Sequence, residues 1–448
     1  MMNPTRDLTK PGCVIAGAVS ILLAIGLATI YVTDTHYAAG HDGPANAARQ
    51  FVYILASLVV VAIIIRLGYH AVLRHTYLLF ALATLFLVPP LIAKLTHSNL
   101  GGFVPSRNGA HRWIQLPGVQ LQPSEFMKVV YVLTLAWYLR YRNNYRRLGG
   151  LLLPFLIFAI PLGLILIEPD LGTVLLLIPV LFVMLFVAGA RLRHLALIAT
   201  IGIAAVPFAW DRIEAYQRLR VTAVLLQSES LRRDVIAHPD RYHRLATRRQ
   251  ALEWSAGTGY QLVHSKNAMG SGGMLGYGWG RGPYVEYPLL PDRHNDFVFA
   301  VVGHQWGFFG CVTVLLCYFA ITLAGVRIAS ATPDPSGRLL AVGIVTLIGT
   351  QAVVNMGMSS GLIPTTGMTL PFVSHGGSSL LSGFMCLGLL ISIARHRPFT
   401  LAAQPFEFTE RDTVPHHPAD QKAVVPGVIG PWSPARGPRN GTSVVLEP

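Results

Sequence analysis

Charged side chains stand beside long apolar segments at only a few places in this sequence, and these are where chemistry is expected. Glu125 and Lys128 open one such segment three residues apart, a spacing that puts both on one helix face. Two interpretations fit them: an internal ion pair that anchors the helix, and a charged wall of an outward-facing cavity. Asp170, in Glu168-Pro169-Asp170, either caps the helix that follows or belongs to a carboxylate group near the membrane surface.

A second set of candidates surrounds the apolar segment that starts at Asp296. An acid in this position suits a helix cap. His304 and Gln305 follow roughly 12 Å deeper along a helix, and His304 fits a hydrogen-bonded packing residue. Arg112-Trp113, in a polar segment, fits an interfacial anchor. Ionisable groups at the edge of a bilayer cost several kcal/mol unless they are paired or hydrated, so each one needs a partner or a function.

The elements that position these residues are predicted to be membrane-spanning helices. Of the 448 residues, 52% are hydrophobic and 12% are charged, with a mean hydropathy of +0.49, whereas soluble domains carry about 25% charged residues. The apolar residues form ten segments near the roughly 20 residues that a helix needs to cross a bilayer. We therefore expect an all-α, polytopic bundle of about ten transmembrane helices, at 12–32, 51–69, 76–95, 124–141, 150–168, 170–190, 194–210, 296–326, 338–360 and 375–395.

The arginines in the short connecting segments indicate the orientation. With ten crossings they fall on one side, which the positive-inside rule makes cytoplasmic, so both termini are predicted to be cytoplasmic. The long loop 211–295, before the eighth span, is then extracytoplasmic. The first apolar segment has about 20 residues, longer than the roughly 7–15 of a signal peptide, which favours a retained span. The predicted organisation is a cytoplasmic N-terminus (1–11), a membrane domain (12–397) and a disordered, Pro-rich cytoplasmic tail (398–448).

Composition also argues against several other functions. The net charge of +14 is spread over short segments between apolar runs, which argues against a nucleic-acid-binding face. The Gly-rich stretch 270–282 lacks the spacing of a nucleotide-binding loop and predicts a compact loop with positive φ or close packing. No disulfide framework is indicated, because the cysteines all lie in apolar runs without a CxxC pair: Cys13, Cys311, Cys317 and Cys386.

Six blocks of sequence, in the same order as in the family, resemble the SEDS family (shape, elongation, division and sporulation), whose members include RodA and FtsW. They span roughly residues 108–385, and the longest runs from Asn355 to Ser379. The others are Arg112-Trp113-Ile114 with Gln122-Pro123-Ser124-Glu125-Phe126 and Lys128, Pro169-Asp170-Leu171-Gly172-Thr173, Tyr216-Gln217-Arg218 with Arg220, Gly270-Ser271-Gly272-Gly273 with Gly276, and His294-Asn295-Asp296-Phe297-Val298-Phe299-Ala300.

The resemblance implies a peptidoglycan glycosyltransferase in the bacterial plasma membrane, acting in cell elongation or division. Such enzymes polymerise lipid II, a disaccharide-pentapeptide on undecaprenyl pyrophosphate, beside a class B penicillin-binding protein and within membrane lipids. Asp296 is implied to be the catalytic base, a role worth roughly 10²–10⁴-fold in rate. A divalent metal, Mg²⁺ or Mn²⁺, could neutralise the pyrophosphate, and no organic cofactor is implied. The residues implied to bind substrate are Arg112, Glu125, Lys128, Asp170, Arg218, Arg220 and Ser378.

Three departures from the family pattern leave other functions open. His304-Gln305 stand where the family usually has two glutamates, His375 stands where tyrosine is usual, and 228–250 is an additional basic stretch. The missing glutamates could weaken metal binding, which motivates a non-catalytic scaffold for a class B penicillin-binding protein as one alternative. A lipid II flippase is the other, although no internal repeat is visible. The basic stretch either contacts the partner or the glycan, or is a solvated insertion.

Overall fold

A computed structural model describes most of the chain and shows how these segments are arranged. It describes residues 9–37, 45–96, 98–106, 111–117, 119–141, 147–168, 170–210, 215–287 and 289–395. The predicted tail 398–448 and most of the predicted N-terminus 1–11 lie outside the described residues.

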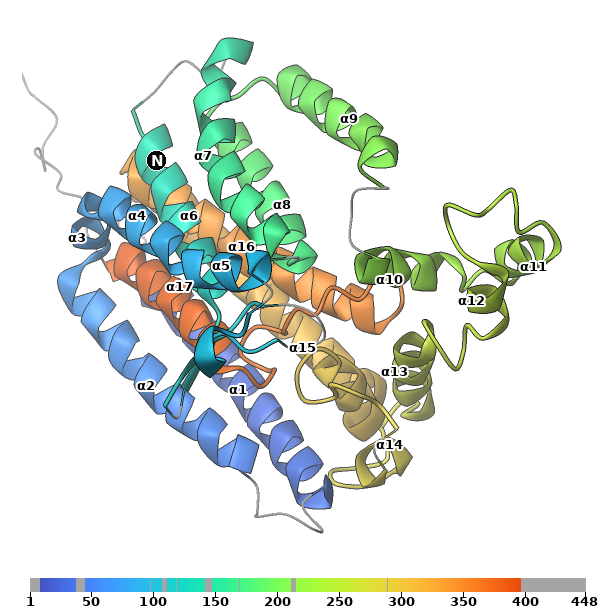
Figure 1. The fold of residues 1–448 in the computed structure, drawn as a ribbon. Helices are drawn as coiled ribbons and strands as arrows, with labels where there is room; N and C mark the ends of the chain where they lie inside the picture. The colour runs from blue at the N-terminus through green and yellow to red at the C-terminus, as the bar shows by residue number, and fades with distance from the viewer. Residues whose placement is uncertain are drawn as a thin grey trace, which may run out of the picture. The chain divides into compact units, whose positions relative to one another are not determined.

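Helices coincide with all the predicted spans, although their ends differ (Figure 1). Within the described residues, seven spans are long and apolar enough to cross a membrane, and α8 and α9 are shorter apolar helices. The third predicted span is divided in two at Leu87. The helices of the membrane domain are α1 (Thr9–Tyr37), α2 (Ala45–Leu67), α3 (Tyr69–Arg74), α4 (Thr76–Phe86), α5 (Val88–Leu95), α6 (Pro123–Leu139), α7 (Leu148–Ile167), α8 (Leu171–Val187), α9 (Leu192–Ala209), α15 (Val298–Ala331), α16 (Pro335–Ser359) and α17 (Gly377–Arg395).

The ends of these helices matter for the candidate residues. Helix α8 begins at Leu171 and α15 begins at Val298, so Asp170 and Asp296 lie just outside the membrane-spanning segments. Helix α17 begins at Gly377, one residue before Ser378. A cap role for Asp296 is wrong, because the residue before α15 is Phe297 and no side chain caps this helix. The total of ten crossings and the cytoplasmic position of both termini stay predictions.

Helix α6 lies at the centre of the bundle. It packs against α4, α8, α16 and α17, while α1 packs on α15 and α2 packs on α17. Almost every side chain of α6 is buried as a result, including the large ring of Tyr131, which contacts Phe158 of α7. Because the neighbouring helices cover all its faces, α6 can carry Glu125 and Lys128 without exposing them to lipid.

The segments between the spans are more structured than predicted. Strands β1 (Ile114–Leu116) and β2 (Val119–Leu121) form an antiparallel hairpin, with Ile114 opposite Leu121, where an all-α fold was expected. The basic stretch 228–250 contributes Val235 and Ala246 to a small separate hydrophobic core. The long loop contains α10 (Ala215–Leu225), α11 (Glu229–Ala237), α12 (Arg248–Leu252), α13 (Tyr260–Ser271) and α14 (Pro283–Glu286), and a short 3-10 turn, η1 (Leu100–Gly102), precedes the hairpin.

The Gly-rich stretch packs against a break in α15, which confirms the predicted compact loop. Gly307 interrupts the helix with φ of 61° and ψ of −154°, a conformation that side chains rarely adopt. The loop then bonds the freed backbone groups: the amide of Tyr277 donates to the carbonyl of His304 at 3.1 Å, and the amide of Phe308 donates to the carbonyl of Gly273 at 2.9 Å. The loop glycines with positive φ are Gly273, Gly276, Gly278, Gly280 and Gly282.

Candidate functional site

Asp296 lines a polar cavity of about 370 Å³ at the end of the bundle where the β-hairpin lies. Its wall combines segments that are far apart in the sequence: the first turns of α2, the hairpin, the residues before α15, and the connection between α16 and α17. A cavity of this size holds a sugar-sized part of a ligand. The described lining residues are Asn46, Arg49, Tyr53, Trp113, Gln120, Gln122, His294, Asn295, Asp296, Gly367, Thr369, His375, Gly376, Gly377, Ser378 and Ser379.

The Asp296 carboxylate is held in a setting suited to a general base. A Cβ added at Gly367 would lie 3.6 Å from Oδ2 of Asp296 and 3.4 Å from Nη1 of Arg220, so the carboxylate and the guanidinium border the same glycine. Burial raises the pKa of Asp296 to about 7 and the Asp292 charge adds to the rise, whereas Arg220 and Arg112 oppose it. A base with this pKa can accept a proton near neutral pH.

The backbone on either side of the cavity is tied to α16. Asn355 is fully buried, and its side-chain nitrogen Nδ2 donates to the backbone carbonyls of Asp296 at 2.9 Å and Met368 at 2.6 Å. One turn earlier on the same helix, Gln351 donates to the carbonyl of Thr369 at 3.0 Å. The spacing of four residues puts both side chains on one face of α16. A single helix therefore holds the backbone at Asp296 and the backbone at Met368 and Thr369.

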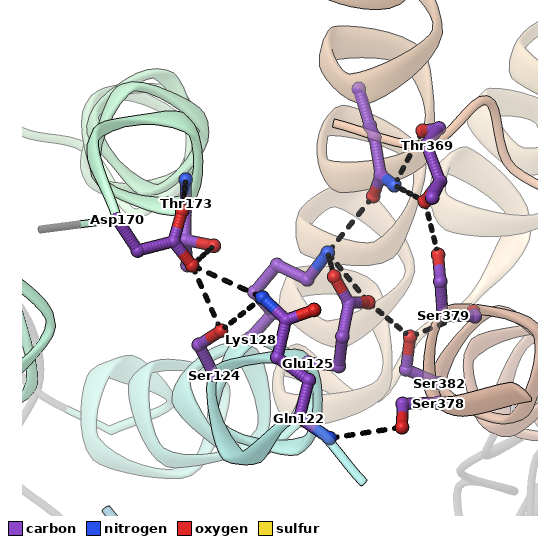
Figure 2. A network of polar contacts seen from close by, with 11 residues as sticks. Gln122, Ser124, Glu125, Lys128, Asp170, Thr173, Thr369, Ser378, Ser379 and Ser382 are labelled. Atoms are coloured by element: carbon purple, nitrogen blue, oxygen red, sulfur yellow. Dashed lines mark hydrogen bonds and ion pairs between the residues drawn. The ribbon is translucent and has the colours of Figure 1, made fainter. Parts of the chain in front are cut away.

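A polar network connects the cavity to Asp170 (Figure 2), and Asp170 in turn contacts Arg112. Gln122 lines the cavity, and its backbone amide donates a hydrogen bond to Oγ of Ser378 at 3.0 Å. The Gln122 side chain donates to Asp170 Oδ2 at 3.3 Å, and Ser124 donates to the same oxygen at 3.0 Å. Nη1 of Arg112 lies 4.0 Å from Asp170. These contacts place Asp170 and Arg112 behind the cavity wall.

Asp170 also confirms its predicted cap role. Its side chain accepts a bond from the Thr173 amide at 3.3 Å and one from the Thr173 hydroxyl at 2.8 Å. The Arg112 charge and the bonds from Thr173 and Ser124 hold the pKa of Asp170 below its usual range, against the effect of burial. Asp170 is therefore an ionised carboxylate that orients Arg112.

Glu125 and Lys128 form the predicted internal ion pair. Lys128 Nζ lies 2.8 Å from Glu125 Oε2, and both side chains are buried. Lys128 also donates to Gln351 at 3.2 Å, and Ser382 donates to Glu125 at 2.9 Å. Gln351 in turn bonds Thr369, which lines the cavity. The ion pair is therefore one residue removed from the cavity, and it supports the wall rather than forming part of it.

Glu168 lies behind Arg112 and differs from Asp170 in its charge. Arg112 Nε donates to the Glu168 carbonyl at 3.2 Å, while the Glu168 side chain is buried. Burial raises the pKa of Glu168 from 4.5 to about 9, helped by the charge of Asp170 and opposed by Arg112. Glu168 is therefore a neutral acid at pH 7.

We expect the Glu168→Gln variant to fold and function like the parent protein at pH 5. The native state holds the Glu168 proton between pH 4.5 and about 9, whereas the unfolded chain releases it, so the parent loses stability as the pH rises through this window. The glutamine variant does not, and its unfolding temperature is expected to exceed the parent's at pH 8. Thermal unfolding in detergent at both pH values measures this. Asp170→Asn is the matched control and is expected to lower the unfolding temperature at both, and a similar loss in Glu168→Gln would contradict the assignment.

The structure brings together most of the predicted site residues, but not all. Asp296 and Ser378 line the cavity, Arg220 borders it, and the network described above joins Arg112, Glu125, Lys128 and Asp170 to it. Arg218 lies on α10 but is not on the cavity lining. The predicted interfacial anchor is wrong for Arg112, which is buried at Asp170.

Two lining residues and the two anchoring amides were not predicted. Arg49 and Tyr53 lie near the start of α2, and Gln351 and Asn355 lie on α16. A polar residue inside an apolar segment is the sequence signal for Gln351, the start of the longest family-like block is the signal for Asn355, and an arginine at the outer end of a span is the signal for Arg49.

His304 and Gln305 lie away from the cavity. Ser271 Oγ is 2.9 Å from Nδ1 of His304, which confirms the predicted hydrogen-bonded packing role. Gln305 is fully buried. Neither side chain is among the residues that line the cavity, so the replacement of the usual glutamates leaves the described lining unchanged.

The described residues contain no group of three or more His, Cys, Asp or Glu side chains placed to hold a metal ion. Asp296 is the carboxylate of the cavity lining. One protein carboxylate is compatible with Mg²⁺ held chiefly by the phosphates of a substrate and by water.

Comparisons with known proteins agree with this architecture. The family profile described as "Cell cycle protein", which covers FtsW, RodA and SpoVE, matches residues 13–398. The "Probable peptidoglycan glycosyltransferase FtsW" of Trichlorobacter lovleyi is 34% identical over 83% of this chain and 90% of its own length. The stage V sporulation protein E of Bacillus subtilis is 31% identical over 87% of this chain and 99% of its own length.

Solved structures show the same fold. A chain from a structure described as "Structural coordination of polymerization and crosslinking by a peptidoglycan synthase complex" aligns with a TM-score of 0.65 at 27% identity, covering 85% of this chain and 96% of that one. The rod shape determining protein RodA of Thermus thermophilus aligns with a TM-score of 0.58 at 26% identity, covering 85% of this chain and 95% of that one.

Proposed function

This chain belongs to the FtsW/RodA/SpoVE family, and we propose that it is a peptidoglycan glycosyltransferase that polymerises lipid II at the outer face of the bacterial plasma membrane. The observation that carries the proposal is Asp296, an acid with a pKa of about 7 in a cavity bordered by an arginine. A carboxylate beside a cation suits a reaction that removes a proton from one substrate and releases an anion from another.

In the proposed reaction a sugar hydroxyl of the acceptor attacks the anomeric carbon of the donor. A carbon–oxygen bond forms there, the bond from that carbon to the diphosphate breaks, and the hydroxyl proton goes to Asp296. The undecaprenyl diphosphate leaves with the electron pair of the broken bond. Proton removal by a placed carboxylate contributes roughly 10²–10⁴-fold, which makes Asp296 the catalytic residue.

The leaving diphosphate is assigned to Arg220 on α10, with the charge of Arg112 behind the cavity wall. Arg220 borders Gly367 beside Asp296, and Arg112 is close enough to lower the pKa of that carboxyl. Planar guanidinium groups form paired, charge-assisted hydrogen bonds with phosphate oxygens. A divalent metal would add positive charge at the same diphosphate, held chiefly by the phosphate oxygens and water.

We assign the partner as a class B penicillin-binding protein, which crosslinks the peptides of the new strands. The structural neighbour from a peptidoglycan synthase complex supports this assignment. The scaffold alternative rested on the missing glutamates. Because His304 and Gln305, which replace them, pack against the Gly-rich loop rather than at the cavity, their replacement gives no support to a non-catalytic scaffold. No observation on the described residues favours the flippase alternative.

Polymerisation of purified lipid II by the detergent-solubilised protein tests the proposal. We expect glycan ladders on a gel with the protein and its cognate penicillin-binding partner, in the presence of Mg²⁺ or Mn²⁺. Parallel reactions without the partner and with a chelator measure what each contributes. Absence of product under every condition, from protein with an intact unfolding transition, would overturn the glycosyltransferase assignment.

A further inference from the structure

Arg49 is the only permanently charged cation among the described residues that line the cavity. It lies in the first turns of α2 and its side chain is exposed. The cations assigned above to the leaving diphosphate stand elsewhere: Arg220 borders the cavity through Gly367, and Arg112 is behind the wall at Asp170. The cavity therefore has a second positive position, and the proposed reaction does not yet use it.

Arg49 and Arg220 meet the cavity at separate positions. Tyr53, one turn after Arg49 on α2, has its ring 6.4 Å from the ring of His375. The His375 ring lies 6.2 Å from that of His294, and the His375 amide donates to the His294 carbonyl at 2.9 Å. His294 is two residues before Asp296. The turn of Arg49 is therefore linked to Asp296 through Tyr53 and the two histidines, whereas Arg220 meets Asp296 at Gly367.

The two histidines add no fixed charge to this link. Burial lowers the pKa of His375 to about 4, and the nearby His294 and Arg49 lower it further, against the charge of Asp34. Burial also lowers the pKa of His294, against the charges of Asp34 and Asp292. Both rings are neutral at pH 7, so the positive charge along this link belongs to Arg49.

The nearest acid to this turn is already engaged. Asp34 at the end of α1 accepts hydrogen bonds from the Asn46 amide at 3.0 Å, the Ala47 amide at 2.9 Å and the Asn46 side chain at 3.0 Å. These bonds use Asp34 to cap the start of α2. No described acid forms an ion pair with Arg49, which lines the cavity.

Arg49 also lies at the depth of lipid phosphates. Both Arg49 and Arg66 lie on α2, and Arg66 is in a segment predicted to be cytoplasmic. The 17 residue steps between them correspond to roughly 25 Å at 1.5 Å per residue. The hydrocarbon core is about 30 Å thick. Arg49 is therefore near the outer edge of that core, where the diphosphate of a lipid-linked sugar meets the membrane surface.

We propose that Arg49 binds the diphosphate of the acceptor substrate, at a position separate from that of the donor diphosphate beside Arg220. This inference rests on the proposed function. Each substrate of the polymerisation carries a sugar on a lipid diphosphate. The donor loses its diphosphate on the Arg220 side, whereas the acceptor keeps its own on the Arg49 side and only needs to be held while its hydroxyl reaches Asp296.

Kinetics of the Arg49→Gln variant test the inference. Loss of one charge-assisted contact is expected to raise KM for lipid II about ten-fold or more, with kcat within about two-fold, because the contact is the same before and during the reaction. Arg49→Lys is expected to recover part of the affinity. The matched control is Arg66→Gln, at the other end of α2, which is expected to leave KM unchanged. An unchanged KM in Arg49→Gln would overturn the inference.

A binding measurement separates this inference from the proposed function. The probe is a short-chain prenyl diphosphate, titrated into the Asp296→Asn protein, with the prenyl alcohol and inorganic pyrophosphate as comparison ligands. Two diphosphate sites are expected in this background and one after adding Arg49→Gln. Two sites in both proteins, or competition at Arg49 by the stem pentapeptide rather than by diphosphate, would overturn it. If Arg49→Gln removes one diphosphate site while the parent protein makes no glycan, the binding site at Arg49 is supported and the glycosyltransferase assignment is refuted.

Discussion

The Asp296→Asn variant is expected to polymerise lipid II about 10²–10⁴-fold more slowly than the parent protein while folding normally. Asparagine keeps the size of the side chain but cannot accept a proton from the attacking hydroxyl. The Asn355 contact to residue 296 is made through the backbone carbonyl and is retained. Initial rates of glycan formation, with thermal unfolding as the test of folding, measure the effect. A rate within two-fold of the parent would refute the catalytic role of Asp296.

The pH dependence of the parent enzyme provides an independent check on the same group. With a pKa of about 7, Asp296 is protonated and inactive as a base at pH 5.5, and the rate is expected to rise as the pH passes through 7. Asp292 contributes to that raised pKa. The matched variant is therefore Asp292→Asn, which is expected to remain active and to shift the rise to lower pH. Asn also tolerates the positive φ of 50° at this position. A rate that does not change between pH 5.5 and 8.5 would contradict this.

The Lys128→Met variant is expected to lose about 3–5 kcal/mol of stability, because it leaves the Glu125 carboxylate buried without its partner. Lys128 has only 3% of its side chain exposed and Glu125 only 9%, so water cannot replace the lost contact. The double variant Glu125→Gln/Lys128→Met removes both charges, and it is expected to recover most of the stability. Unfolding in mild detergent, for both single variants and the double variant, gives the coupling between the two residues.

An exposed pair elsewhere in the chain is the control for this experiment. Arg249 and Glu253 also form an ion pair, at 3.1 Å, but their side chains are 83% and 59% exposed. Replacing Arg249 by methionine is expected to change stability by less than about 1 kcal/mol. Equal losses at the two pairs would show that burial is not what makes the Glu125–Lys128 pair important.

Activity should also fall in Lys128→Met, because Lys128 bonds Gln351, which holds the Thr369 backbone at the cavity.

The helices of this protein could be predicted from the sequence because their cause is local. An apolar segment of about 20 residues has few alternatives to a membrane-spanning helix, since the bilayer offers no other partner for its backbone groups. The same reasoning predicted that the acids beside such segments need partners. It placed Lys128 with Glu125, since two residues on one helix face are neighbours whatever the rest of the chain does.

The cavity could not be predicted in this way, because its wall joins residues that are distant in the sequence. Arg49 and Asp296 face the same space because α2 packs on α17 and the connection between α16 and α17 turns back toward α15. No periodicity in the sequence of α2 indicates this. The β-hairpin at Ile114 was missed for a similar reason: its strands have three residues each, which is too short for an alternating pattern to be recognised.

The sequence by itself determined the membrane class, the positions of the helices and, through a resemblance, the family, and it predicted a role for Asp296. The tertiary structure decided which charges are accessible to a substrate. Glu125 and Lys128 are ionisable in the sequence but are enclosed by four neighbouring helices, whereas Arg49, which looks like an ordinary residue at the end of a span, faces the cavity. The physical reason is that desolvation and charge pairing depend on every element packed around a group, and those elements come from the whole chain.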